Sequence, residues 1–272
     1  TYLINTGDDD GTFEEQKCRY SFVSYVKTDS NLGYSGGNNL GIELALKAGC
    51  TEFLITNPDV KFAKNAVKYL EQALLSRSEI GAAGPVWRIS TGQQRLAKTI
   101  AVWSQEQNRY LWSTPLLNEL NGVIQTEALS GCCFLITRRA IDRVWVFDER
   151  FFMYWEEIDL CRRMNRAGIK QIVVPNALIW HRSHDVGATA NEMRRAYYHY
   201  RNWLLFLSKH NSKTRISRKE VYVKLLSDSF RRALRQPGQG FEMLKGGILG
   251  IRDFRLGHFG RLDIAEKSRT KA

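Results

Sequence analysis

The chain has 272 residues, of which 43% are hydrophobic and 25% are charged, and these fractions exclude a disordered or fibrous protein. No apolar run approaches the roughly 20 residues needed to cross a bilayer, and no signal peptide is recognisable, so we expect neither a membrane-spanning nor a secreted protein. The net charge of +12 is concentrated in residues 201–272, which hold 17 Lys and Arg against 6 Asp and Glu. A basic tail of this kind suits nucleic acid or an anionic membrane surface.

Short apolar runs alternate with helical patterns over the first 85 residues. Residues 2–4, 22–26 and 52–56 are typical of strands. Apolar residues at helical spacing follow the second and third runs, namely Leu40, Leu44 and Ala48 before Gly49, and then Val67, Leu70 and Leu74. This alternation predicts an α/β fold with a mostly parallel central sheet flanked by helices. Since residues 2–4 resemble an internal strand, we expect either an abrupt start of the fold or a first strand that this chain lacks.

The second half of the chain is less regular at first, and we interpret residues 88–125 as a long excursion over the sheet. Three further elements are expected: a buried strand over residues 132–137, a helix over residues 156–167 closed by Gly168, and a strand over residues 171–174 stopped by Pro175. From residue 191 onward the pattern is helical. A rise in Lys and Arg density predicts a domain over residues 1–210 and a basic, mostly helical extension over residues 211–272.

The five cysteines follow no repeated metal-binding spacing, and their number is odd. Cys132 and Cys133 are adjacent, so their side chains would point to opposite faces of a strand. We expect free, buried thiols in a reducing cytoplasm.

A segment rich in glycine and asparagine, residues 31–41, leads directly into the first expected helix. Glycines let backbone N–H groups approach a phosphate, and a helix N-terminus favours an anion. The segment matches neither a Walker loop nor a dinucleotide-binding fingerprint. A tight strand-to-helix turn explains it equally well.

Two polar positions follow expected strands. Asp59 comes just after strand 52–56, where ligands bind in open α/β sheets, and its carboxylate suits a divalent cation that carries a diphosphate. The alternative is that Asp59 caps the next helix. His181 follows strand 171–174, although a lone histidine is more often structural than a ligand, and His184 lies nearby.

Residues 147–160 contain five carboxylates among aromatic residues. Glu156, Glu157 and Asp159 open a helix, where negative charge is locally favourable. That position explains the acidity but not the aromatic residues. Carboxylates packed against aromatic side chains lose solvent, which can raise their pKa toward that of a useful general base.

Together these segments resemble one family. The chain carries five patterns in order: Asn-x-Gly-x-x-Gly-Gly-Asn-x-x-Gly from residue 31, Asn-Pro-Asp from residue 57, Ser-Gly-Cys-Cys-x-Leu-Ile-x-Arg-Arg from residue 130, Phe-Asp-Glu-x-Phe-Phe-x-Tyr-x-Glu-Glu-x-Asp-Leu from residue 147, and Pro-x-Ala-x-x-x-His from residue 175. Their order and spacing resemble the family-two glycosyltransferases, in particular the rhamnosyltransferase-like and galactofuranosyltransferase-like branches. The resemblance covers about residues 2–210.

The resemblance implies a GT-A fold and inverting sugar transfer from a nucleoside-diphosphate donor, with Mg²⁺ or Mn²⁺ bound by Asp59 and His181. The residues that it places at the donor are Asn5, Asp10, Asn31, Gly36, Gly37, Asn39, Asn57 and Asp59. The position of the general base corresponds to Glu157, with Glu156 beside it and Asp159 as a fallback. Three residues depart from the family pattern: Glu157 replaces the usual Asp, Asn57 replaces the first acid of an Asp-x-Asp motif, and Ile4 replaces the Asp that usually precedes Asn5.

The resemblance also implies a dTDP- or UDP-linked donor, with rhamnose as the best guess, and a glycan acceptor carried on a polyprenyl diphosphate, in the synthesis of a cell-surface polysaccharide such as an O-antigen. We expect a cytoplasmic protein that is peripheral on the inner face of the membrane, because the basic tail also carries apolar residues at helical spacing. Transfer of galactose, glucose or galactofuranose stays open, as does a non-catalytic sugar-nucleotide-binding role. Nucleic acid is not an expected partner, since only the charge of the tail suggests it.

Overall fold

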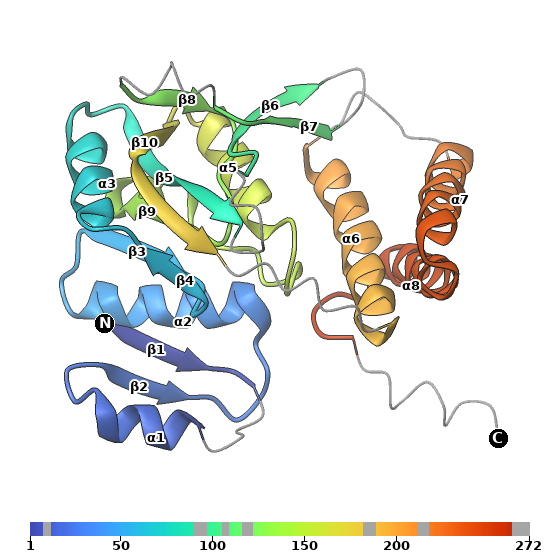
Figure 1. The fold of residues 1–272 in the computed structure, drawn as a ribbon, viewed down its shortest axis with the longest axis horizontal. Coiled ribbons are helices and arrows are strands. Elements are labelled where there is room, and N and C mark those ends of the chain that lie inside the picture. The colour runs from blue at the N-terminus through green and yellow to red at the C-terminus, as the bar shows by residue number, and fades with distance from the viewer. Residues whose placement is uncertain are drawn as a thin grey trace.

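The computed structural model describes residues 1–7, 12–89, 97–104, 109–115, 122–181, 189–210 and 218–262. Within these ranges a mixed α/β body carries three long helices on one side (Figure 1). The first half of the chain forms β1 (Tyr2–Asn5), α1 (Thr12–Arg19), β2 (Ser24–Lys27), α2 (Gly33–Lys47), β3 (Glu52–Thr56), β4 (Val60–Phe62), α3 (Ala66–Leu75) and β5 (Ile80–Ile89). The second half forms β6 (Ile100–Ser104), β7 (Arg109–Ser113), β8 (Ile124–Thr126), β9 (Cys133–Thr137), α4 (Arg138–Val144), α5 (Glu156–Arg166), β10 (Lys170–His181), α6 (Thr189–His210), α7 (Arg218–Arg235) and α8 (Pro237–Leu256).

The central sheet has six strands in the order β3-β9-β5-β10-β4, and β8 pairs with the first part of β10. β5 and β10 are parallel, whereas β9 runs antiparallel between β3 and β5. β1 and β2 form a separate parallel pair. The α/β class is confirmed, but the sheet is mixed rather than mostly parallel. The alternation of strands and helices predicts parallel strands that are joined by helices. β9 follows the long segment after β5 instead of a helix, so the alternation does not predict its direction.

Two expectations about the middle of the chain were wrong. Residues 88–125 are not an irregular excursion throughout, because β6 and β7 pair with each other and β8 joins the central sheet. β10 also continues past Pro175, where we expected it to stop. Its register against β5 shifts between Val174 and Leu178, and such an irregularity accommodates a residue that cannot donate a ladder hydrogen bond.

The strands that share a direction bring their carboxyl ends to one side. In Figure 1 the arrowheads of β1, β3, β5 and β10 point toward α6. The segments after β1 and β3 and the end of β10 therefore lie at the edge where open α/β sheets bind ligands. All five cysteines are free, as predicted, although Cys18 and Cys50 are exposed.

The three long helices pack closely because glycines of α8 face α6. A Cβ atom at Gly246 would lie 2.0 Å from the carbonyl oxygen of Met193, and one at Gly250 would lie 2.4 Å from that of Tyr197. α6 in turn contacts the body, and residues of all three helices belong to the main hydrophobic core. The domain boundary that we place near residue 210 thus separates helices that share one core. No helix in the described part of the chain is long and apolar enough to cross a membrane.

Gly246→Ala should lower the free energy of unfolding by about 1–3 kcal/mol, the usual cost of overpacking. The added methyl would meet a backbone carbonyl, which cannot rotate away. Urea denaturation measures the loss. Lys245→Ala, at the exposed neighbouring position, is the matched control and should change stability by less than about 0.5 kcal/mol. Equal effects of the two substitutions would show that α6 and α8 can move apart freely.

Candidate active site

The loop that precedes α5 has an unusual backbone. Phe152, Tyr154 and Trp155 have φ angles of 65°, 67° and 78°, in the left-handed region that non-glycine residues rarely adopt. Each such residue costs on the order of 1–3 kcal/mol and persists only where its surroundings hold it. Strain of this kind clusters at functional sites, and here it precedes the two glutamates that begin α5.

Arg201 and Asn202, which are fully buried on α6, hold this loop in place. Nδ2 of Asn202 donates hydrogen bonds of 2.8 Å to the carbonyl oxygens of Phe151, Met153 and Tyr154. Nη2 of Arg201 donates to the Phe151 carbonyl at 2.9 Å. The sequence alone gives neither residue a role. The available signal was the run Tyr200-Arg201-Asn202, which fits the pattern of the same glycosyltransferase branch.

Glu156 and Glu157 begin α5 in a poorly solvated place. Glu156 is only 4% exposed, and Glu157 is half-buried. Burial raises the pKa of both carboxyl groups, and the charge of Glu157 raises the pKa of Glu156 further. The Oε2 atom of each is buried and has no hydrogen-bond partner among the described residues. The two groups therefore titrate as a coupled pair, and the pKa of each lies above that of an exposed glutamate.

Glu156→Gln should raise the melting temperature at pH 8 but not at pH 4. The folded-state pKa of Glu156 lies well above its ordinary value of 4.5. The wild type therefore loses stability as the pH rises from the ordinary pKa to the folded-state pKa. The loss is about 1.4 kcal/mol for each unit of pKa shift. Glutamine carries no proton that must be lost, and below the ordinary pKa both proteins are neutral at this position. Thermal unfolding at both pH values checks the prediction, and an equal gain at both would contradict it.

Asn57, Asp59 and His181 meet in space, although the first and last are 124 positions apart. Oδ1 of Asp59 lies 3.2 Å from Nε2 of His181, and Nδ2 of Asn57 lies 3.4 Å from the same nitrogen. Antiparallel pairing of β4 with the end of β10 sets this contact, because His181 lies opposite Val60. Asp59 does not cap the next helix, since β4 intervenes and Asn65 is the N-cap of α3.

This pair of side chains fits a divalent cation. A carboxylate oxygen is a suitable ligand for Mg²⁺ or Mn²⁺, and the imidazole nitrogen beside it suits Mn²⁺ better than the harder Mg²⁺. The side chains of Asp59 and His181 are 25% and 18% exposed. In the part of the chain that the structure describes, no three His, Cys, Asp or Glu residues gather as a metal site. Two protein ligands suit a cation that takes its other oxygens from substrate phosphates and water.

The turn before β9 joins the two parts of the site. The carbonyl oxygen of Cys132 accepts the backbone N–H of Asn57 at 2.9 Å. A Cβ atom at Gly131 would lie 3.4 Å from Cδ of Glu157. Burial raises the pKa of the Cys132 thiol to about 11, and the nearby charges of Glu157 and Asp59 contribute to this. The candidate base and the candidate metal ligands therefore flank one turn.

Comparison with known proteins gives this geometry a family. The N-acetylglucosaminyl-diphospho-decaprenol L-rhamnosyltransferase of Mycobacterium tuberculosis is 30% identical over 231 residues, which cover 77% of this chain and 75% of that protein. The chain belongs to the rhamnosyltransferase-like glycosyltransferases. The low-salt glycan biosynthesis hexosyltransferase Agl10 of Haloferax volcanii is 26% identical over 163 residues, 57% of this chain and 50% of that protein. No protein-family model matches the chain.

Solved glycosyltransferase structures share the GT-A fold of this chain. GalNAc-T7 with UDP, GalNAc and Mn²⁺ superimposes with a TM-score of 0.60 at 14% identity, over 99% of this chain and 51% of that one. The mannosyltransferase PcManGT from Pyrobaculum calidifontis, in complex with GDP-Man and Mn²⁺, gives a TM-score of 0.52 at 14% identity, over 94% of this chain and 77% of that one. At 14% identity, the structural similarity to these two enzymes establishes that the fold is shared.

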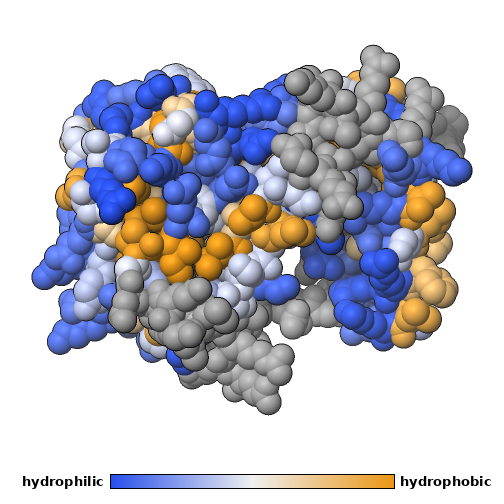
Figure 2. All heavy atoms as spheres, turned by 90° about the horizontal axis from the view of Figure 1, so that it is seen from above, coloured by the Kyte–Doolittle hydropathy of each residue, from blue (hydrophilic) through white to orange (hydrophobic). Residues whose placement is uncertain are grey.

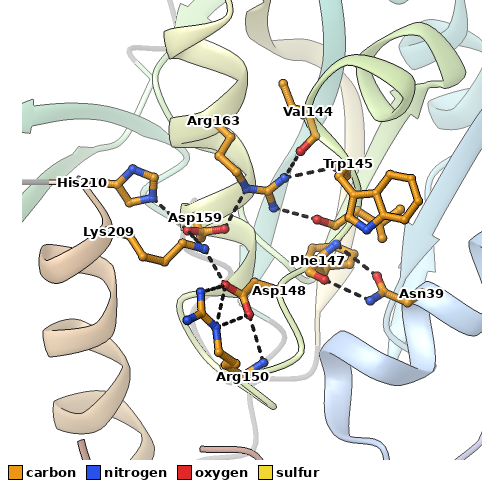
Figure 3. A network of polar contacts seen from close by, with 11 residues as sticks. Asn39, Val144, Trp145, Phe147, Asp148, Arg150, Asp159, Arg163, Lys209 and His210 are labelled. Carbon is orange, nitrogen blue, oxygen red and sulfur yellow. Dashed lines mark hydrogen bonds and ion pairs between the residues drawn. The ribbon is translucent and has the colours of Figure 1, made fainter. Parts of the chain in front are cut away.

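In this glycosyltransferase Asp159 belongs to an ion-pair network (Figure 3). Its buried carboxylate lies 2.8 Å from Nε of Arg163, 2.7 Å from Nζ of Lys209 and 2.8 Å from Nε2 of His210. Burial raises the pKa of Asp159, but these three contacts outweigh it and lower the pKa overall. A carboxylate that is fully enclosed and paired with cations is a poor proton acceptor, so the geometry does not support Asp159 as the fallback base.

Much of the glycine-rich segment packs against protein. Gly33 has a φ of 66°, and a Cβ atom there would lie 2.4 Å from the carbonyl oxygen of Phe152, so glycine lets α2 start beside the strained loop. The side chain of Asn31 accepts the N–H of Gly33 at 2.9 Å. Asn39 exchanges two 3.0 Å hydrogen bonds with the backbone of Phe147, so the donor-binding prediction for Asn39 has less support than a structural role.

The remaining donor-site predictions are Asn5 at the end of β1, Asp10, and Gly36 and Gly37 in α2. Gly36 and Gly37 are buried in α2, and a Cβ atom at Gly37 would lie 3.1 Å from Cγ2 of Thr6. The side chain of Asn5 accepts the N–H of Gly7 at 3.0 Å. Asp10 lies outside the described residues. Asn5 and Gly37 are thus close to the same short segment, where their assignment to the donor pocket stays a prediction.

Proposed function

We propose that this chain transfers a sugar, with L-rhamnose as the first candidate, from a dTDP- or UDP-linked donor to a polyprenyl-diphosphate-linked glycan, with inversion at the anomeric carbon. The observation that carries the proposal is that one turn, Gly131–Cys132, contacts the segment of Asp59, which lies against His181, on one side and lies beside Glu157 on the other. The mycobacterial relative, named for L-rhamnose and diphospho-decaprenol, supports the choice of sugar and acceptor. Work at the cytoplasmic face of the cell membrane, in the synthesis of a cell-surface polysaccharide, belongs to the same proposal.

In the proposed reaction Glu157 accepts the proton of an acceptor hydroxyl as its oxygen attacks the anomeric carbon. The raised pKa of Glu157 brings it closer to the pH at which a general base is most effective. Arg201 and Asn202 hold the loop that positions both glutamates. Asp59 and His181 would hold a divalent cation, which would supply Lewis-acid stabilisation of the leaving diphosphate.

A donor screen tests this function. Purified protein, Mn²⁺ and a synthetic lipid-linked acceptor are mixed with dTDP-rhamnose, UDP-galactose, UDP-glucose or UDP-galactofuranose, and release of nucleoside diphosphate is followed. We expect release with dTDP-rhamnose that depends on the acceptor, and an inverted anomeric configuration in the product by NMR. Turnover of another donor would favour the hexosyl or galactofuranosyl alternative. Donor binding without turnover would favour the non-catalytic one.

A further inference from the structure

The outer face of α7 exposes a line of large apolar side chains. Val223, Leu226, Phe230 and Leu234, the α7 stripe, are 55%, 55%, 65% and 72% exposed. Their spacing of three and four residues places them along one side of the helix. Single exposed apolar residues are normal on a protein surface, but a contiguous apolar line marks an interaction site. The opposite side of α7 already packs on the other helices, for example through the buried Leu225.

α8 adjoins the α7 stripe and extends it. Phe241, Ile248 and Leu256 are 68%, 47% and 59% exposed. The two helices are in contact on this side, because Nη1 of Arg255 on α8 donates a 3.1 Å hydrogen bond to the hydroxyl of Tyr222 on α7. Figure 2 shows hydrophobic atoms gathered between hydrophilic ones at the outer margin of this helical end.

Cations surround these apolar side chains. Residues 218–256 contain nine Lys and Arg against four Asp and Glu. The exposed cations are Lys219, Arg231, Arg235, Lys245, Arg252 and Arg255. Of the four acids, Asp253 is buried, Asp228 and Glu242 are half-buried, and Glu220 is exposed. An apolar line flanked by Lys and Arg is the pattern of helices that lie in the interface of a bilayer.

We infer that the outer face of α7 and α8, with the α7 stripe at its centre, binds the surface of an anionic lipid bilayer. Exposed Arg and Lys side chains would pair with lipid phosphates, and the apolar side chains would enter the boundary between headgroups and acyl chains. A second copy of this chain fits this face less well, because two positively charged surfaces would oppose each other. Nucleic acid would leave the apolar side chains unused.

The structure sorts the apolar residues of the basic tail into two groups. Leu226, Phe230, Leu234 and Ile248 are exposed, whereas Leu225 is buried and Phe254 packs against the core. The inference deepens the proposed function, since a lipid-linked acceptor would be presented at the same surface. Binding to lipid, however, requires neither donor nor acceptor, so the membrane surface and the proposed function can be tested separately.

Vesicle flotation tests the inference with the full chain. The vesicles are phosphatidylcholine with phosphatidylglycerol, or phosphatidylcholine alone. We expect at least about tenfold more protein on the anionic vesicles at about 50 mM salt, and release at about 500 mM salt, where charges are screened. Absence of binding, or equal binding to the neutral vesicles, would overturn the inference.

Two double variants separate the apolar and the charged contributions. Phe230→Ser with Leu234→Ser, and Arg231→Gln with Arg235→Gln, should each reduce anionic vesicle binding about tenfold or more. Leu75→Ser, on α3 and 63% exposed in the wild type, is the control and should bind as the wild type does. Circular dichroism verifies that all variants fold. Undiminished binding by both double variants would contradict the assignment to this face.

Two further measurements distinguish the remaining outcomes. Transfer to a short water-soluble acceptor should be unchanged in both double variants. Loss of vesicle binding with retained turnover therefore supports both the membrane surface and the proposed function. Vesicle binding by a wild type that shows no turnover would contradict the proposed function alone. Sedimentation velocity reports self-association. If the wild type is a dimer and Phe230→Ser with Leu234→Ser makes it monomeric, the α7 stripe is an interface between copies and the membrane assignment is wrong.

Discussion

Glu157→Gln should slow sugar transfer by about 10²–10⁴-fold, the usual contribution of a general base, and leave donor binding nearly unchanged. Glutamine preserves the size of the side chain at the start of α5 but cannot accept the proton of the acceptor hydroxyl. Steady-state kinetics measure the first effect and calorimetric titration with the donor measures the second. Because burial raises the pKa of Glu157 above its ordinary 4.5, the wild-type rate should also begin to fall at a correspondingly higher pH on the acid side.

Neighbouring carboxylates provide the controls for this assignment. Glu156→Gln should retain transfer, because the assignment gives the role of base to Glu157 and glutamine preserves the size of the neighbouring side chain. Glu157→Asp should remain active, since aspartate keeps a carboxylate at this position and is only one methylene shorter. Asp159→Asn should reduce stability more than turnover, because it weakens contacts with Arg163, Lys209 and His210. An inactive Glu156→Gln beside an active Glu157→Gln would transfer the role of base to Glu156.

The fold could be predicted where local pattern and tertiary structure agree. Strand β3 and helix α5 fall within a residue of their expected limits, because strong apolar runs and a closing glycine define them. β10 was predicted too short, since the sequence shows Pro175 as a stop and does not show the register shift that accommodates it. The antiparallel course of β9 depends on pairing with β3 and β5, which no local pattern specifies.

The residues of the candidate site also fall into those that the sequence predicts and those that it does not. Asp59 and Glu157 could be found because both follow the family pattern at the edge of the sheet. Asp159 could not be separated from Glu157 by sequence, because its ion pairs come from Lys209 and His210 on α6. The positioning role of Asn202 depends on three carbonyl groups of a strained loop, and nothing in the order of residues predicts that contact.

Asp59→Ala should reduce transfer by about 10²–10³-fold or more, as expected when one element of charge stabilisation at a leaving group is removed. Asp59 supplies the carboxylate of the pair that faces Nε2 of His181, so its loss should also weaken Mn²⁺ binding in the absence of any substrate. Calorimetric titration with Mn²⁺ reports this second effect independently of turnover. EDTA should abolish transfer by the wild type, and added Mg²⁺ or Mn²⁺ should restore it.

Asp142→Ala is the matched control for the metal assignment. Asp142 is an exposed carboxylate on α4 that forms an ion pair with Arg138 at 3.5 Å, and its removal should affect neither Mn²⁺ binding nor transfer. Transfer that survives both EDTA and Asp59→Ala would remove the metal from the mechanism. The proximity of Asp59 to His181 would then have a different meaning: a hydrogen bond that ties the segment after β3 to the end of β10, whose loss lowers stability rather than rate.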